Sequence, residues 1–127
     1  MGFTLDTGAF IALQRRKRRA WQFIELASLE GVELRAPADV LTEFWRGTSL
    51  IRPLSTLIED GIAWVDVTPR LAKRAGRALA DAGAGLSAVD ALVATVAAAF
   101  GDVVLTSDPE DFARLTRHFR GLRILGV

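Results

Sequence analysis

Hydrophobic and polar positions along the chain follow two alternating patterns. Short, dense apolar runs are typical of buried strands, and they occur at residues 3–5, 32–35, 62–67, 103–106 and 122–127. Between these runs, apolar residues recur every three or four positions, which is typical of amphipathic helices. The helices expected from this spacing are 7–14, 21–29, 37–45, 53–60, 69–82, 87–100 and 109–119. The alternation of strands and helices predicts an α/β fold with a mostly parallel central sheet covered by helices.

One expected helix, 87–100, differs from the others because it is rich in alanine and apolar on nearly every side. A helix that is apolar all round is normally buried. We therefore expect this helix to be central and to lie close against the sheet.

The size and composition of the chain are those of an ordinary globular protein. Its 127 residues predict one domain over 1–127. The absence of cysteine excludes disulfides and thiolate metal sites, and it suits a reducing cytosol. No apolar stretch reaches the roughly 20 residues that span a bilayer, and the first residues lack the basic and apolar regions of a signal peptide. We therefore expect a cytoplasmic protein without a membrane segment.

The net charge is only +1, but basic residues are concentrated in two places. Residues 15–19 are all arginine or lysine. Arg70, Lys73, Arg74 and Arg77 have the spacing of one stripe on a helix. Such stripes can bind phosphate backbones, and they can equally be a solvated helix face. Both interpretations remain open from the sequence.

Acidic residues occur where the expected strands end. Asp6 follows the strand 3–5, and Asp108 follows the strand 103–106. Ligands of parallel α/β sheets bind beyond the carboxyl ends of the strands, so both side chains are expected at one edge. Asp90 lies in the first turn of the helix 87–100, which can begin at that edge. Glu43 lies within the helix 37–45, next to its apolar side.

Helix capping is the alternative explanation for most of these acids. Ser87 and Asp90 have the spacing of a capping box, Asp108 before Pro109 is a typical helix start, and Asp6 or Thr7 can cap the first helix. Capping does not explain Glu43, and it does not explain why the acids gather.

Gathered carboxylates are electrostatically unfavourable. Two of them about 4 Å apart repel by roughly 4 kcal/mol at an effective dielectric constant near 20. Protons, a cation or basic neighbours are needed to offset this. Oxygen ligands favour the hard cations Mg²⁺ and Mn²⁺. The single histidine, His118, is expected at the surface and cannot by itself form a typical zinc site.

Four sequence motifs resemble those of PIN-domain ribonucleases, and specifically the VapC toxins of bacterial type II toxin–antitoxin pairs. They are LDTGAFIAL at 5–13, TEFWRG at 42–47, LSAVDALVA at 86–94 and LTSDPEDF at 105–112. They occur in the family's order and span nearly the whole chain. One departure is Gly8, where a serine is common, so that a possible hydroxyl is lost.

The resemblance implies a three-layer α/β/α sandwich and a metal-dependent endoribonuclease toxin. A cognate VapB-like antitoxin would neutralise it, and a homodimer is suggested. The resemblance further implies that one or two Mg²⁺ or Mn²⁺ ions are held by Asp6, Glu43, Asp90 and Asp108.

Other residues are expected to assist these acids. Asp111 would act through water, while Thr7 and Thr106 match the hydroxyl positions that orient the first and fourth acids. Exposed basic side chains are expected to contact RNA or an acidic segment of the antitoxin. These are Arg15, Arg16, Arg46, Lys73, Arg74 and Arg77.

A second partner surface is expected around 45–57, where apolar residues form either core or a groove for an antitoxin helix. These residues are Trp45, Leu50, Ile51, Leu54 and Leu57.

Two other functions fit the sequence less well. A phosphotransfer domain with Asp6 as nucleophile would have a second acid two residues later, where this chain has Gly8, and a lysine near the site. A non-catalytic PIN-like module that binds RNA or protein would not need all of the acids.

Overall fold

A five-stranded parallel sheet forms the centre of the protein, in the order β3-β2-β1-β4-β5. The computed structural model describes residues 1–47 and 49–127. The central strand β1 pairs with β2 on one side and with β4 on the other, so that Thr4 lies between Arg35 and Val104. The strands are β1 (Phe3–Leu5), β2 (Leu34–Pro37), β3 (Ala63–Val65), β4 (Val103–Thr106) and β5 (Arg123–Gly126).

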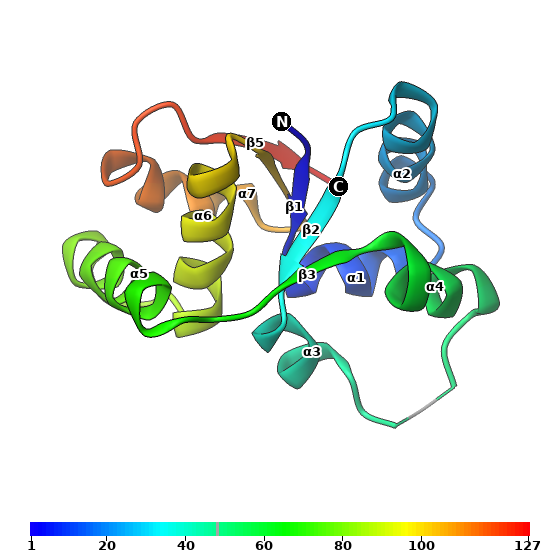
Figure 1. The fold of residues 1–127 in the computed structure, drawn as a ribbon, viewed down its shortest axis with the longest axis horizontal. Coiled ribbons are helices and arrows are strands. Elements are labelled where there is room, and N and C mark those ends of the chain that lie inside the picture. The colour runs from blue at the N-terminus through cyan, green and yellow to red at the C-terminus, as the bar shows by residue number, and fades with distance from the viewer. Residues whose placement is uncertain (48) are drawn as a thin grey trace.

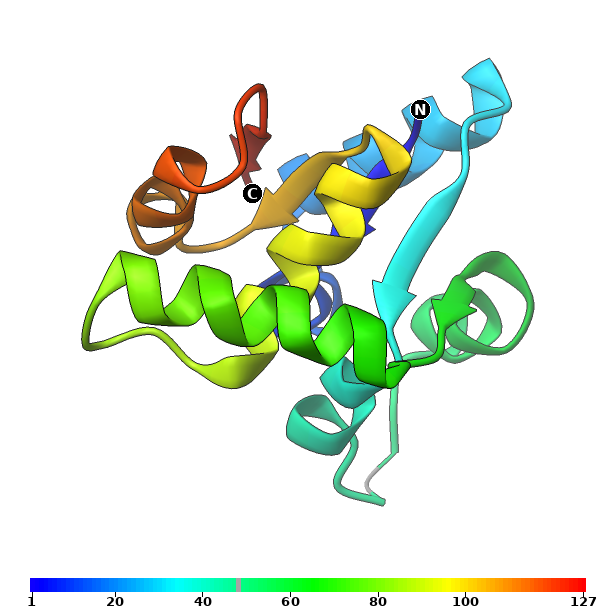
Figure 2. The ribbon, with the colours of Figure 1, turned by 60° about the vertical axis from the view of Figure 1, so that its left-hand side comes forward.

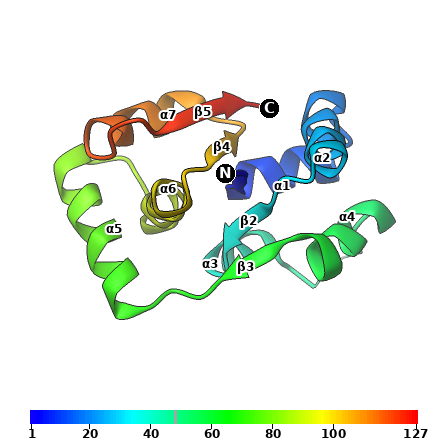
Figure 3. The ribbon, with the colours of Figure 1, turned by 45° about the horizontal axis from the view of Figure 1, so that its top comes forward.

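Helices cover both faces of the sheet, which makes a three-layer α/β/α arrangement (Figures 1 and 3). Helices α5, α6 and α7 lie on one side and α1, α2 and α4 on the other, while α3 lies beyond the end of β2. The fold class predicted from the sequence is therefore confirmed, and every strand pair is parallel. The helices are α1 (Thr7–Gln14), α2 (Arg18–Glu30), α3 (Asp39–Phe44), α4 (Arg52–Thr56), α5 (Pro69–Ala82), α6 (Ala88–Phe100) and α7 (Pro109–Ala113).

Helix α6 is the buried helix that the sequence predicts. Residues 91–97 are buried without interruption, and α6 contacts β1, β2 and β4. The small side chains of Ala91, Ala94 and Ala97 allow the helix to approach the sheet closely. Helix α5 runs across the outer side of α6 (Figure 2). The first turn of α6 is consequently fixed between the sheet and α5.

Strand β2 lies two residues later than predicted. The backbone N–H of Val32 donates to the carbonyl of Ala27 at 3.0 Å, after Gly31 has taken the left-handed conformation that ends α2. Val32 therefore belongs to the helix end. Pro37 ends the strand instead of starting a helix, and α3 begins at Asp39.

Two helices predicted as continuous are each divided in two. Residues 53–60 form α4 and then a π-helical turn, η1 (Leu57–Gly61). Residues 109–119 form α7 and then a 3₁₀ turn, η2 (Arg114–Arg117). Hydrophobic spacing does not distinguish these tighter and wider turns from α-helix, because their periods are too similar over one turn.

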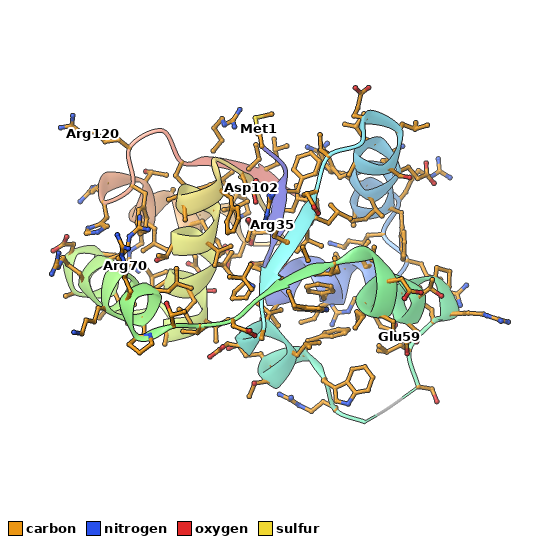
Figure 4. All side chains as sticks on the ribbon, in the orientation of Figure 1. Met1, Arg35, Glu59, Arg70, Asp102 and Arg120 are labelled. Carbon is orange, nitrogen blue, oxygen red and sulfur yellow. The ribbon has the colours of Figure 1, made fainter. Side chains whose placement is uncertain are left out.

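An ion pair between the buried Asp102 and the partly buried Arg35 joins the strands at the other end of the sheet, where they begin. The Asp102 carboxylate accepts hydrogen bonds from the backbone N–H of Gly2 at 2.7 Å, from the Thr4 hydroxyl at 2.9 Å and from the Arg35 guanidinium at 2.7 Å. Figure 4 shows Arg35 and Asp102 close together near the N-terminus. Because Asp102 directly precedes β4 and its carboxylate accepts from groups on or next to β1 and β2, this cluster fixes β1, β2 and β4 relative to each other.

Among the described residues, no helix is long and apolar enough to cross a membrane.

Candidate active site

Asp6 is a buried carboxylate at the carboxyl end of the central strand β1. Its residue is only 6% exposed. One carboxylate oxygen caps α1 by accepting the backbone N–H of Ala9 at 2.7 Å, and the other accepts the Thr106 hydroxyl at 2.5 Å. The capping interpretation of Asp6 is therefore correct, but one oxygen is held by a hydroxyl from another strand.

Thr106 joins the ends of β1 and β4. Its hydroxyl donates to Asp6 and accepts the backbone N–H of Asp108 at 2.9 Å. The two strands are paired, with Leu5 opposite Leu105, so the residues that follow them lie at the same edge of the sheet. This is the convergence of Asp6 and Asp108 that the strand ends predict.

Glu43 is brought to this edge by α3. Its carboxylate oxygen Oε1 accepts the Thr7 hydroxyl at 2.6 Å, which ties α3 to the start of α1. Thr7 therefore orients the second acid, whereas the sequence assigned the two threonines to the first and fourth acids. The side chain of Glu43 remains exposed.

Asp90 combines two roles that the sequence presented as alternatives. It forms the predicted capping box, in which the backbone N–H of Asp90 donates to the Ser87 hydroxyl at 3.0 Å and that of Ser87 donates to Asp90 at 3.3 Å. The charges of Glu43 and Asp108 also act on its carboxylate and raise its pKa, after burial as the main cause. Asp108, by contrast, precedes α7 without a side-chain capping bond, so its carboxylate is not used at the helix start.

Burial and neighbouring acids raise the pKa of Asp6 and of Asp90. Burial is the main cause that raises the pKa of Asp6 from 3.8 to about 6, and the charges of Asp90 and Asp108 add to it. Hydrogen bonds from Thr106 and Ala9 act in the opposite direction. The pKa of Asp90 is also raised, chiefly by burial and then by Glu43 and Asp108. Residues from four separate segments thus share one electrostatic environment.

The raised pKa of Asp6 links folding to pH. The folded protein holds this proton more tightly than the unfolded chain does, so protonation stabilises the fold. This stabilisation is fully present below about pH 4 and is lost as the pH rises through about 6.

Asp111 lies beside Asp108. A hydrogen bond between the two carboxyl groups is the main cause that raises the pKa of Asp111, and the charges of Asp108 and Asp90 contribute. Asp111 therefore joins the acidic group through Asp108, and its action through water stays a prediction.

Arg114 is a contributor to the site that the sequence analysis missed. Its guanidinium donates to the carbonyls of Ala82 at 3.0 Å and Ala84 at 2.5 Å, so it holds the loop that leads to Ser87. Its charge also lowers the pKa of Asp111. One side chain thus connects the segments that carry Asp90 and Asp111. In the sequence, only the position of Arg114 three residues after Asp111 could have indicated this connecting role.

The donor atoms suit a hard divalent cation, although they are not arranged as a finished binding site. The candidate ligands are carboxylate oxygens, and oxygen ligands favour Mg²⁺ and Mn²⁺. Within residues 1–47 and 49–127, however, no three acid or histidine side chains are grouped closely enough to hold a metal ion. The chemistry of the residues fits, and their spacing is wider than that of a coordinated cluster.

The basic residues singled out in the sequence are exposed, and none is paired with an acid of the site among the described side chains. Arg46 donates to the carbonyls of Thr42 and Trp45, both at 2.9 Å, and so caps the end of α3. Arg74 and its stripe neighbours are exposed on α5, whose buried residues are Ala75 and Ala78. His118 forms a hydrogen bond through Nδ1 at 2.6 Å with Asp81, which is not one of the four candidate ligands.

Only part of the expected apolar partner surface is exposed. Leu54 is fully buried, so of the two alternatives left open by the sequence, core or groove, this residue is core. Leu50, Ile51 and Leu57 are half-buried against the core. Trp45 is 51% exposed and lines an open hollow of about 490 Å³ together with Leu41, Thr42 and Ile58.

Comparison with known proteins agrees with this architecture. The PIN domain family model matches residues 3–117. No curated protein sequence matches the chain. A three-layer fold with acids at the carboxyl edge of a parallel sheet thus coincides with a family match over most of the chain. The protein therefore belongs to the PIN domain family.

Solved structures with the same fold cover nearly all of the chain. VapBC2 from Rickettsia felis, bound to a promoter DNA fragment, has a TM-score of 0.73 at 16% identity, over 100% of this chain and 99% of that one. DNA-bound VapBC from Salmonella typhimurium has a TM-score of 0.71 at 21% identity, over 99% and 98%. VapC20 from Mycobacterium tuberculosis, a toxin that cleaves the Sarcin-Ricin loop, has a TM-score of 0.69 at 20% identity, over 96% and 99%.

Substitution of Asp90 separates its charge from its capping role. Asn retains the oxygen that accepts the Ser87 N–H, so Asp90→Asn should leave the stability of the metal-free protein unchanged or raised, because repulsion is relieved. Asp90→Ala loses the capping bond and should be less stable than the Asn variant by roughly 0.5–1 kcal/mol. Urea denaturation measures both values. A clear loss of stability in the Asn variant, which keeps the capping oxygen, would contradict the repulsion between Asp90 and the neighbouring acids.

Proposed function

We propose that this protein is a metal-dependent endoribonuclease of the VapC toxin type, which hydrolyses RNA phosphodiester bonds and is neutralised by a VapB-like antitoxin. The observation that carries the proposal is the convergence of Asp6, Glu43, Asp90 and Asp108, in which Asp6 and Asp90 have raised pKa values partly because of the neighbouring acids. The toxin that cleaves the Sarcin-Ricin loop has the same fold.

The four acids would hold one or two Mg²⁺ or Mn²⁺ ions. Such a cation, when bound, makes a water molecule easier to deprotonate and offsets the negative charge that grows on the phosphate oxygens. The residues of the chain do the rest. A carboxylate of the site accepts the proton of the attacking water, and Thr106 and Thr7 hold Asp6 and Glu43 in place. In-line attack leaves 5′-phosphate and 3′-hydroxyl ends.

Basic side chains at the surface would bring RNA to a site that repels it. A cluster of carboxylates is unfavourable for a polyanion until cations are bound, whereas exposed arginine and lysine attract one. The proposed contacts are Arg15, Arg16, Arg46, Lys73, Arg74 and Arg77, all of which are exposed.

The second candidate function is a non-catalytic PIN-like module that binds RNA or protein. One observation favours it, which is that the described acids are not grouped closely enough to hold a metal ion. This second function does not account for the raised pKa values of Asp6 and Asp90, because a binding module does not need gathered carboxylates.

The proposed antitoxin would dock in two ways. An apolar helix would lie in the hollow beside Trp45, which is exposed and adjoins α3. An arginine of the antitoxin would reach the acids, where its charge replaces that of the cation. The solved structures that share the fold include VapBC2 and VapBC, both bound to DNA.

Cleavage of RNA by the purified protein tests the catalytic proposal. We expect cleavage of structured RNA that depends on Mn²⁺ or Mg²⁺, and a loss of roughly 100-fold or more in Asp6→Asn and in Asp90→Asn. Circular dichroism should show that both variants remain folded. Asp60→Asn is the matched control, because this exposed acid lies on η1 outside the site, and it should cleave like the wild type. Equal cleavage by all four proteins would reveal a contaminating nuclease.

The antitoxin proposal has its own measurement, which is the Mn²⁺ affinity of the free protein and of its inhibited complex. Replacement of the cation by an arginine predicts a much weaker affinity in the complex. An unchanged affinity would mean that inhibition occurs elsewhere on the surface.

A further inference from the structure

Gly8 is the second residue of α1, and the backbone there does not require glycine. It is absent from the glycines with a left-handed φ, so any L-residue could adopt its conformation. Glycine is also less favourable than alanine in a helix. The reason for glycine at this position must therefore be sought in the space around it.

That space is occupied by Ser107. A Cβ atom added to Gly8 would overlap the Ser107 hydroxyl, and it would lie 3.3 Å from the Ser107 Cβ and 3.4 Å from the carboxylate oxygen Oδ1 of Asp6. The absence of a side chain at position 8 thus lets a hydroxyl from the loop after β4 sit beside the most buried acid of the site.

The Ser107 hydroxyl is also free to donate. The Thr7 hydroxyl proton is given to Glu43, and the Thr106 hydroxyl proton is given to Asp6. Ser87 accepts the backbone N–H of Asp90 as part of its capping box. Within the part of the chain that the structure describes, Ser107 makes no side-chain hydrogen bond, and its residue is exposed.

We propose that the Ser107 hydroxyl contacts the substrate by donating its proton to a non-bridging oxygen of the scissile phosphodiester. A phosphodiester anion that enters a group of carboxylates needs hydrogen-bond donors, and the neighbouring threonine hydroxyls have already given their protons to acids. The inference rests on the proposed nuclease function and adds to it a specific phosphate contact. It also explains Gly8 as the residue that makes room for this hydroxyl.

Moving the hydroxyl from position 107 to position 8 tests the proposal. Three variants are compared with the wild type: Ser107→Ala, the double variant Gly8→Ser with Ser107→Ala, and the control double variant Gly8→Ala with Ser107→Ala. Both double variants bring the same pair of Cβ atoms into contact, so they differ only in the hydroxyl. The readouts are kcat and KM for a labelled mixture of RNA hairpins with Mn²⁺, and the thermal unfolding midpoint.

We expect Ser107→Ala to lower kcat/KM by roughly 10- to 100-fold, as for the loss of one hydrogen bond to a charged group. Gly8→Ser with Ser107→Ala should regain most of that loss, and the control double variant should not. The two double variants should unfold at the same temperature. A difference between their kcat/KM values then reflects the hydroxyl and not a difference in stability.

The remaining outcomes overturn the inference and separate it from the proposed function. If Ser107→Ala cleaves like the wild type, or if the two double variants are equally active, Ser107 does not contact the substrate. The nuclease proposal then still stands as long as Asp6→Asn is inactive. If the wild type cleaves no RNA, the proposed function and this inference both fail.

Discussion

The site depends on burying the Asp6 carboxylate at the end of the central strand while other acids surround it. Burial alone is unfavourable for a charge, and the charges of Asp90 and Asp108 make it more so. Two hydrogen bonds, from the Thr106 hydroxyl and the backbone of Ala9, offset part of this cost. Because the rest of the unfavourable free energy is not offset, the site favours added positive charge, either a proton or a cation. The surrounding structure holds the acids in place despite their repulsion.

The fold supplies that restraint through contacts between distant segments. The pairing of β1 with β4 places the residues after both strands side by side, and Thr106 then joins them. Close packing of the alanine-rich α6 fixes Asp90, and Arg114 holds the loop before it. At the opposite end of the sheet, the paired Asp102 keeps the same strands in register. The ion pair and hydrogen bonds of Asp102, at the end where the strands begin, thus help to hold the sheet together against the repulsion between acids at its carboxyl end.

Much of this arrangement could be predicted from the sequence, because it depends on local pattern. The strand ends placed Asp6 and Asp108 at one edge, and the apolar run of α6 predicted its burial. The pairing of Thr7 with Glu43 could not be predicted in this way, because it joins residues 36 positions apart whose contact depends on how α3 packs on α1. The same holds for Arg114 and Asp102, whose partners lie in other elements. Hydrophobic spacing likewise could not show that Leu54 is core and Trp45 surface, since both have apolar side chains near short helices.

The central proposal is that the acids form a site for a divalent cation. Isothermal titration calorimetry of Mn²⁺ into the metal-free protein, at pH 5 and pH 7.5, tests it most directly. The account predicts specific binding at pH 7.5, weaker binding at pH 5 because Asp6, with a pKa of about 6, is then mostly protonated, and little binding in Asp6→Asn at either pH. Equal Mn²⁺ binding by the wild type and Asp6→Asn, or none by either, would contradict it.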